Sequence, residues 1–350
     1  MRPQEFMNHY KVRADGWSLD YGSALELTEE AVSKEKIQPE VEVASEDWGP
    51  VALKMGPEQA LQDLVPVRVV DGVRRLHQRL VLELPDGFWY GGMGSIATGA
   101  LEILPGQTRS LEQALIAARI ERFALFGGVG EVFNTPLLIP GVPLPFQGRR
   151  ISQENTPSAP VEALHTLMRQ AEDALVNDLQ NSQQIGLTLV DGPLQFHRID
   201  RKGKVVGFVK SQYTRYLPSQ LQFWVQRLAP RERTPLFGIG EDILSWYVNL
   251  GQTQLTDHAL SGIVRLETVS DGSKTHLNQV IELANGLQAL LPLLATLRHK
   301  DPRAPQNLVP VQALENALRR KMGSEMLIQR RLQQFLYSEI KAQQTKEIET

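Results

Sequence analysis

The chain has 350 residues and no cysteine, with 42% hydrophobic residues, 22% charged residues and a net charge of −3. This is the composition of a globular protein, and the lack of cysteine excludes disulfides, thiolate metal sites and cysteine nucleophiles. The N-terminus lacks the apolar core of a signal peptide, and no window holds the roughly 18 uninterrupted apolar residues that span a membrane. We therefore expect a cytoplasmic protein without a membrane partner.

Charge is distributed unevenly along the chain. Residues 1–60 carry 6 Lys/Arg against 12 Asp/Glu, a net charge of −6. We expect this segment to be an N-terminal arm that packs on the main body, with a helix from Ser23 to Lys36 and an acidic connector after it.

Residues 195–234 have the opposite character, with 9 Lys/Arg against 2 Asp/Glu, a net charge of +7. Their basic residues are interleaved with aromatic ones, a combination that suits phosphates and bases of a nucleic-acid strand. A basic surface whose aromatic rings belong to the core explains the pattern equally well. The candidate DNA-binding residues are Lys202, Lys204, Tyr213, Arg215, Tyr216 and, further along the chain, Arg265.

The first core strand is predicted at 65–71, where a β-branched run ends on Asp71-Gly72. Strand patterns at 77–84, 88–90 and 95–104 follow, which predicts an antiparallel meander. Residues 105–160 predict an insertion with a helix at 111–122. Its glycine clusters lack a following Lys-Ser/Thr, so no phosphate-binding loop is expected there.

A helix is predicted over 160–180, and it leads directly into a second buried strand, Leu187 to Val190, that ends on Asp191-Gly192-Pro193. Glu172 lies beside the apolar stripe of this helix, where it either leans over the end of the strand or is a solvated glutamate. Asp71 and Asp191 lie 120 residues apart. Because both end the same kind of strand, we expect the two strands to lie in one sheet and to bring both carboxylates to one metal site.

The rest of the chain predicts a mixture of strands and helices. A hairpin of 193–199 and 204–210 ends on Lys210, which faces the same edge as the carboxylates or is a plain surface lysine. Arg265 and Glu267 share one face of a strand and form an ion pair, or Arg265 contacts phosphate. The remaining elements are strands at 237–250 and 259–269, helices at 277–298, 311–322 and 324–341, and a polar tail from 343.

Carboxylates that converge beside cationic and aromatic groups suit metal-assisted phosphodiester hydrolysis. Carboxylate oxygens are hard ligands that Mg²⁺ and Mn²⁺ prefer. Two such ions about 3.5–4 Å apart activate water and stabilise the leaving oxygen, and Lys210 would offset charge in the transition state. Asp-Gly is also a common turn dipeptide, so the pattern alone leaves a purely structural interpretation open.

Four short motifs resemble, in this order, those of the NurA nucleases, and a fifth segment is similar to the bacterial branch of that family. The resemblance runs from about residue 60 to residue 340. It implies an α/β fold with a ribonuclease H-like mixed sheet flanked by helices, as a domain over 61–342 between the arm 1–60 and the tail 343–350. The motifs are Val69–Gly72, Leu189–Leu194, Val206–Lys210 and Val264–Glu267, and the further segment is Asp301–Leu308.

The resemblance also implies a function. NurA proteins are homodimeric, manganese-dependent DNA nucleases, with magnesium as an alternative ion. They act 5′ to 3′ on DNA ends and on single strands, together with HerA, a hexameric ATP-driven DNA translocase. This partnership serves end resection in recombinational repair, which would place the protein in the cytoplasm at the nucleoid.

The site residues carry over one by one. Asp71 and Asp191 match the two motif aspartates, Lys210 matches the motif lysine, and Glu172 is carried over as the helix glutamate. Many archaeal members have a C-terminal histidine that helps the metal site. The equivalent stretch here, 310–315, has none, so either Glu315 supplies an oxygen ligand or that ligand is missing. His258 is expected to be structural.

Two other functions compete with the nuclease. The first is a non-catalytic adaptor that binds DNA on the HerA-type motor while other proteins cut, which the missing histidine and the acidic arm keep open. The second is a phosphatase with an aspartyl-phosphate intermediate, which usually has a second aspartate two residues after the first. Val73 and Pro193 occupy those places, which disfavours it.

Overall fold

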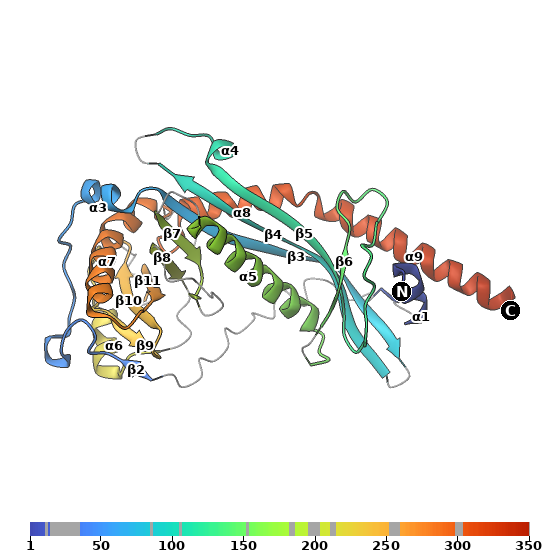
Figure 1. Ribbon diagram of the computed structural model, residues 1–350, viewed down its shortest axis with the longest axis horizontal. Helices are drawn as coiled ribbons and strands as arrows, with labels where there is room; N and C mark the ends of the chain where they lie inside the picture. Colours follow the sequence, from blue (N-terminus) through green and yellow to red (C-terminus); the bar gives the residue numbers. More distant parts are fainter. Residues whose placement is uncertain are drawn as a thin grey trace.

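The computed structural model describes residues 1–10, 13–14, 36–84, 87–104, 107–151, 154–181, 186–194, 204–210, 215–251, 260–297 and 304–349. In this part of the chain eleven strands form one mixed sheet flanked by helices, which confirms the α/β prediction. The molecule is elongated, with short strands gathered at one end and a long ribbon that reaches toward both termini (Figure 1). None of the described helices combines the length and the apolar character needed to cross a membrane.

The centre of the sheet is a long antiparallel meander of β3 (Val67–Leu84), β4 (Gly87–Ile103) and β5 (Leu115–Phe126). The segments predicted at 65–71 and 77–84 are one continuous strand, interrupted only by a bulge between Leu76 and Gln78. The predicted meander is therefore confirmed, but its strands are much longer than expected.

The helix predicted at 111–122 is wrong. Only α4 (Leu111–Ala114) is helical, and the chain then continues as β5, which pairs with β4 from Leu115 to Phe126. The apolar spacing of this segment suits a helix, but the backbone hydrogen bonds offered by the neighbouring long strand outweigh that local preference. The segment predicted as an insertion also supplies β6 (Gln147–Arg150), which pairs in parallel with β5.

On the other side of β3 the sheet continues with parallel strands. Helix α5 (Ala159–Gln180) confirms the helix predicted at 160–180 and precedes β7 (Leu187–Asp191). β7 pairs in parallel with both β3 and β8 (Lys204–Val209). The first arm of the predicted hairpin falls largely outside the described residues, and its second arm, β8, runs parallel to the strand that precedes it.

Antiparallel strands complete the sheet beyond β8. They are β11 (Ile263–Val269), β10 (Ile243–Asn249), β9 (Phe237–Ile239) and β2 (Ile37–Gln38), in that order. The predicted strand at 237–250 is therefore two short ones, β9 and β10, which pair with each other across the turn between them. At the far end of the ribbon, β1 (Arg13–Ala14) pairs with β3.

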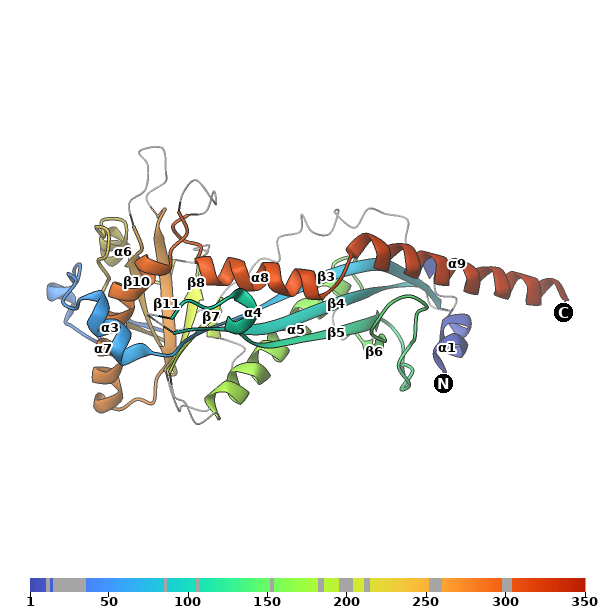
Figure 2. The ribbon, with the colours of Figure 1, turned by 90° about the horizontal axis from the view of Figure 1, so that it is seen from above.

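Helices cover both faces of the sheet. Helix α5 crosses one face, whereas α8 (Val309–Lys321) and α9 (Glu325–Glu349) follow one another along the other face (Figure 2). Helix α7 (Lys274–Leu294) packs with α3 (Pro57–Leu64) at the end that holds the short strands. The three predicted C-terminal helices are confirmed, and α9 continues to Glu349 through the segment expected to be a polar tail. The remaining helices are α1 (Pro3–His9), η1 (Ser45–Asp47) and α6 (Ser219–Val225).

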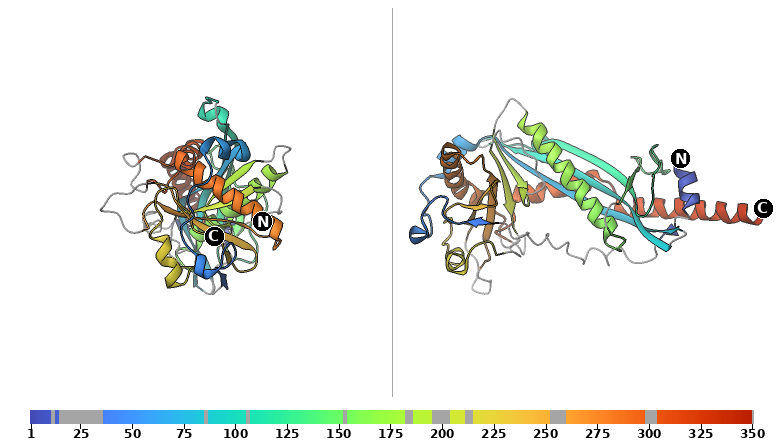
Figure 3. Two further views of the ribbon diagram at one scale, coloured as in Figure 1. Left: turned by 90° about the vertical axis from the view of Figure 1, so that its left-hand side faces the viewer. Right: turned by 60° about the horizontal axis from the view of Figure 1, so that its bottom comes forward.

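The apolar core has two large parts that lie at opposite ends of the long strands. One joins β3, β7, β8, β10 and β11 to α7 and α8, and the other joins the far ends of β3 and β4 to α1 and α9 (Figure 3). The predicted N-terminal arm contributes to both ends. Phe6 of α1 is buried in the distal part, whereas Glu42 accepts hydrogen bonds from the buried guanidinium of Arg233. The predicted helix from Ser23 to Lys36 falls almost wholly outside the described residues.

Alternate residues of β3 face opposite helices, as the pleat of a strand requires. Val69 and Val73 belong to the core that includes α8, whereas Val70 packs with Val176 of α5. A methyl group on Gly72 would lie 2.5 Å from Glu172 Oε1 of α5. Before the bulge, odd-numbered residues of β3 therefore face α8 and even-numbered residues face α5.

Candidate metal centre

Asp71 and Asp191 lie side by side because β3 and β7 are adjacent parallel strands in register. Val70 pairs with Val190, so the next residue of each strand emerges at the same level of the sheet. Both aspartates have the odd parity that directs their side chains toward α8. The prediction that the two strands lie in one sheet and bring these carboxylates together is confirmed.

A third carboxylate reaches the same place from α8. Asp71, Asp191 and Glu315 each offer an oxygen, and these atoms all lie within 4.8 Å of one another. The Oδ2 atom of Asp71 is buried and has no hydrogen-bond partner. Three clustered carboxylates with an oxygen left unsatisfied fit a hard divalent cation such as Mn²⁺ or Mg²⁺. The cation itself stays a prediction.

The environment of Asp71 disfavours its charged form. The side chain is 6% exposed, and its Oδ1 accepts a hydrogen bond from the backbone N–H of Gly72 at 2.8 Å. Burial raises the pKa of Asp71 well above its ordinary value, and the charges of Asp191, Glu172 and Glu315 raise it further, against a smaller opposing effect of Lys210. A bound cation would remove this penalty by neutralising the cluster.

Lys210 lies at the carboxylates, as predicted from its place at the end of β8. Its Nζ donates to Asp191 Oδ2 at 2.9 Å and to Asn307 Oδ1 at 3.1 Å. Asn307 is 2% exposed and precedes α8, so it fixes the ammonium group between the C-terminal segment and the sheet. Sequence reasoning missed this role of Asn307.

Glu172 lies against the same part of β3 but on the opposite face. It is fully buried on α5, its Oε2 accepts a hydrogen bond from Arg169 at 3.0 Å, and its Oε1 has no partner. Burial, partly opposed by Arg169, raises the pKa of Glu172 to about 7. Among the described residues, Glu315 and not Glu172 joins the two aspartates in the close carboxylate cluster. Glu172 lies against Gly72 on the other face of β3.

Arg169 ties α5 to the end of β7. Its Nη1 donates to Glu172 at 3.0 Å and to the backbone carbonyl of Asp191 at 2.7 Å. A methyl group on Gly192, which has a φ of 105°, would lie 2.4 Å from Arg169 Nη2, so glycine is needed there both for the turn and for space. The spacing of Arg169 three residues before Glu172 on a helix is the signal that could have revealed this pair.

Arg265 is a correction to the predicted DNA contacts. It is 3% exposed, forms an ion pair with Glu267, and lies over the ring of Tyr216 at 4.5 Å. Glu267 in turn accepts a hydrogen bond from the backbone N–H of Leu194, just after Asp191. Of the two roles proposed for Arg265, the structure supports the ion pair, which anchors the turn that follows the second aspartate.

The other predicted DNA-binding residues are scattered. Lys202 and Tyr213 fall outside the described residues, and Arg215 is exposed. Lys204 pairs with Leu187 at the opposite end of β7 from Asp191, and its Nζ donates to the backbone carbonyl of Asp63 at 2.6 Å. This placement argues against a role for Lys204 beside the carboxylates.

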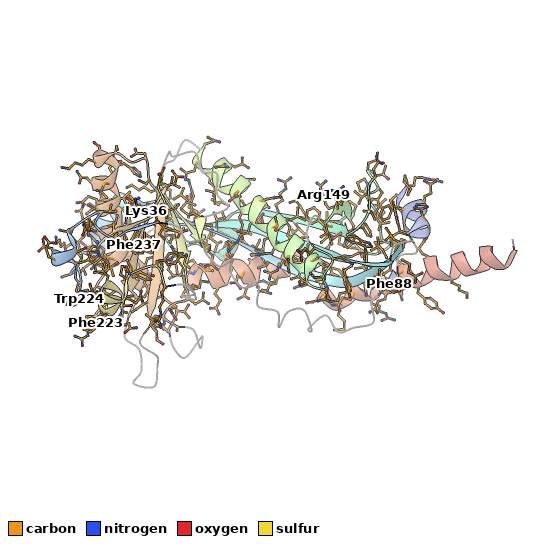
Figure 4. All side chains as sticks on the ribbon, turned by 90° about the horizontal axis from the view of Figure 1, so that it is seen from below. Lys36, Phe88, Arg149, Phe223, Trp224 and Phe237 are labelled. Atoms are coloured by element: carbon orange, nitrogen blue, oxygen red, sulfur yellow. The ribbon has the colours of Figure 1, made fainter. Side chains whose placement is uncertain are left out.

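Two aromatic residues of the basic segment lie on α6. Phe223 is 43% exposed, and the guanidinium of Arg227 lies 3.9 Å from its ring centroid. Phe223 and Trp224 are at the opposite end of the molecule from Phe88 (Figure 4). Exposed aromatic and basic groups do occur together here, but on the end that holds the short strands.

Comparison with known proteins finds no relative of this chain. The chain matches no model of a known protein family, and no curated protein matches it.

Proposed function

We propose that the protein is a metal-dependent DNA nuclease of the NurA type. In this proposal Asp71, Asp191 and Glu315 hold Mn²⁺ or Mg²⁺, and the protein acts 5′ to 3′ on DNA ends and on single strands. A homodimer works with a HerA-type hexameric ATPase in end resection. The observation that carries the proposal is the convergence of three carboxylates from three separate elements, one of which, Asp71, has a buried Oδ2 without a hydrogen-bond partner.

The order of the strands supports the same conclusion. The central strands run in the order β5-β4-β3-β7-β8, with the first three antiparallel and the last two parallel to β3. This arrangement is compatible with the ribonuclease H-like core that the motif resemblance implies. The site lies where β7 ends and its parallel pairing with β3 stops.

The residues of the chain would divide the work in hydrolysis. The bound cation would supply Lewis-acid stabilisation of the phosphate and activation of water. Lys210 holds Asp191 in place and puts a positive charge beside the reacting phosphate. Glu172 is buried on the opposite face of β3, where it holds Arg169 and, through it, the end of β7.

The proposal is tested by cleavage and by metal binding together. The parent protein and an Asp191→Asn variant are incubated with end-labelled single-stranded DNA and manganese, and manganese binding is measured by calorimetry. We expect the variant to lose cleavage and to bind manganese at least tenfold more weakly, because one ligand loses its charge. Asp178→Asn, which removes an exposed acid of α5, is the matched control and should change neither. Equal cleavage by the parent and Asp191→Asn would contradict the proposal.

The adaptor remains the second candidate, and one contact favours it. Lys210 already neutralises Asp191 within the fold, so the cluster has an internal cation of its own. No histidine is present at 310–315 to complete a metal site. If the parent binds DNA but cuts none of it with manganese, even in the presence of a HerA-type partner and ATP, the adaptor is the better description.

A further inference from the structure

A groove leads away from the carboxylates along the open edge of β3. β7 pairs with β3 only from Val67 to Val70, and β1 pairs with it only at Leu80 and Val81. Among the described residues, the edge between these two partners has no neighbouring strand. The groove of about 490 Å³ is lined there by every residue of β3 from Asp71 to Leu76, with α5 on one side and Glu315 and Arg319 of α8 on the other.

The α5 side of this groove gathers basic groups. Arg74 of β3 and His165 and Arg169 of α5 all line it. Arg169 is engaged with Glu172 and with the carbonyl of Asp191. Within the described part of the chain Arg74 and His165 have no hydrogen bond or ion pair, although both are half-buried.

The charge of Arg74 favours an anion, whereas His165 is neutral at pH 7 and offers a ring N–H. Burial lowers the pKa of Arg74, and the positive charge of Arg169 lowers it further, against a smaller effect of Glu172. The pKa of His165 falls to about 4, first through burial and then through Arg74 and Arg169. A half-buried guanidinium crowded by a second one, with only the smaller effect of Glu172 to offset them, is costly unless a ligand supplies negative charge. Arginine matches phosphate especially well because its donors form a planar fork.

We propose that Arg74 and His165 form a phosphate-binding subsite that holds the backbone of a nucleic-acid strand as it approaches the carboxylates. This inference rests on the proposed function and adds to it the path that the nucleic-acid strand takes to the carboxylates. Arg74 lies three residues along β3 from Asp71, about 10 Å between the two backbone positions. The two side chains face opposite sides of the sheet, so the nucleic-acid strand would pass around the open edge of β3, where one groove is lined by both residues. The separation along β3 spans a few nucleotides, so one strand reaches both places, with Arg74 as a positioning residue.

The test measures binding apart from cleavage. Affinity for a short labelled oligothymidylate is measured with EDTA present, at several salt concentrations, for the parent, Arg74→Gln and Arg74→Lys. We expect Arg74→Gln to weaken binding roughly tenfold and to reduce the slope of log K against log salt by about 0.7, the value for one lost phosphate contact on a single strand. Arg74→Lys keeps the charge and should retain most of the slope.

The matched control is Arg150→Gln, which removes the same charge from an exposed position on β6. It should leave affinity and slope unchanged. If Arg74→Gln behaves like Arg150→Gln while both keep the thermal stability of the parent, the subsite is refuted. Inorganic phosphate at equal phosphate concentration should compete poorly with the oligomer, and equal competition would mean that the pocket takes a free anion and not a strand.

Failure of this inference is separable from failure of the proposed function. Cleavage that depends on Asp191, combined with an Arg74→Gln variant that binds normally, refutes only the subsite. Binding that depends on Arg74, in a protein whose cleavage does not depend on Asp191, upholds the subsite and refutes the nuclease.

Discussion

The carboxylates clustered at Asp71 lower the free energy of unfolding of the metal-free protein. Because burial and three neighbouring acids raise the pKa of Asp71, its charge at neutral pH is unfavourable in the folded state. We predict that Asp71→Asn raises the free energy of unfolding of the metal-free protein by about 1–3 kcal/mol. The measurement is chemical denaturation at pH 7 in EDTA.

The same variant should lose the response to metal. Manganese should raise the melting temperature of the parent, since a ligand that binds only the folded state stabilises it, and should barely change that of Asp71→Asn. A destabilised Asp71→Asn variant in EDTA would show that the carboxylate is held by interactions other than a cation.

A second residue-scale prediction concerns pH. His77 is fully buried, its Nε2 is 2.7 Å from Ser95 Oγ, and Arg122 donates to the same hydroxyl. Burial, with smaller effects of Arg122 and Arg75, lowers the pKa of His77 from 6.5 to about 3. Between these values the unfolded chain binds a proton that the folded protein excludes, so stability falls as pH drops.

We therefore predict that His77 costs the parent about 2 kcal/mol of stability between pH 7 and pH 5. His77→Gln keeps a polar partner for Ser95 and removes this titration, so its stability should fall less over the same interval. Unfolding curves at the two pH values measure the difference. Parallel losses in parent and variant would contradict the assignment of the titration to His77.

How far the site could be predicted differs from residue to residue. Asp191 and Lys210 lie at strand ends, where an abrupt Asp-Gly or a terminal lysine signals the position directly. Asp71 was predicted to end a strand, but it lies within β3, at the point where the pairing of β3 with β7 stops. Glu315 was predicted only as an alternative ligand, because a helix pattern alone does not show which strand end the helix will cover. Glu172 was predicted as a ligand, but its ion pair with Arg169 and its place behind Gly72 depend on packing that no local pattern encodes.

At the scale of elements, the close approach of α5 to β4 depends on glycine. A methyl group at Gly94 would lie 2.3 Å from Leu164 Cδ1 and 2.9 Å from the carbonyl oxygen of Arg75. We predict that Gly94→Ala lowers the free energy of unfolding by about 1–3 kcal/mol, because the core must shift to admit the methyl group. Gly130→Ala, at an exposed position with open space around the new methyl group, should be nearly neutral in the same denaturation experiment.

The elements also show why sequence patterns fail where they do. Helix α5 has an apolar stripe on one side and was predicted within a residue of its true ends. Residues 111–122 have helical spacing, yet from Leu115 onward they form β5 because β4 offers them a long unpaired edge. The existence of that edge follows from the great length of β4, which sequence patterns divided into two short strands.

At the scale of the whole molecule, α9 holds the distal core together. Leu332 is fully buried there with Leu80, Leu82 and Phe126. We predict that Leu332→Ala lowers stability by about 2–4 kcal/mol and speeds hydrogen exchange of the distal ends of β3 and β4. Leu327→Ala, at a side chain that is 49% exposed on the same helix, is the control. We expect hydrogen exchange around Asp71 to stay unchanged, because Asp71 lies beside the other part of the core. An equal rise there would show that the two parts of the core unfold together.

The fold class and most of its elements were predictable, but the overall shape was not. Apolar periodicity marks each helix and strand separately, whereas the elongated outline results from strands of 18 and 17 residues that run through both parts of the core. The placement of α1 and α9 at the same distal end is likewise a long-range contact between the two ends of the chain. Neither the elongated outline nor the contact between α1 and α9 can be read from a short stretch of sequence.

The bulge between Leu76 and Gln78 changes the parity of β3. Asp71 and Val73 face α8 as odd-numbered residues, yet Leu80 and Leu82 pack against α9 on the same side as even-numbered ones. Because of this one extra residue, odd-numbered side chains face the α8 and α9 side before the bulge and even-numbered side chains face it afterwards. The sequence of the single strand therefore resembles that of two strands. The bulge shifts the alternation of side chains by one residue. In a regular strand without the bulge, the same residues would leave either the carboxylate or the distal leucines on the wrong side of the sheet, whereas a variant that also lacks the one extra residue would keep both on their present side.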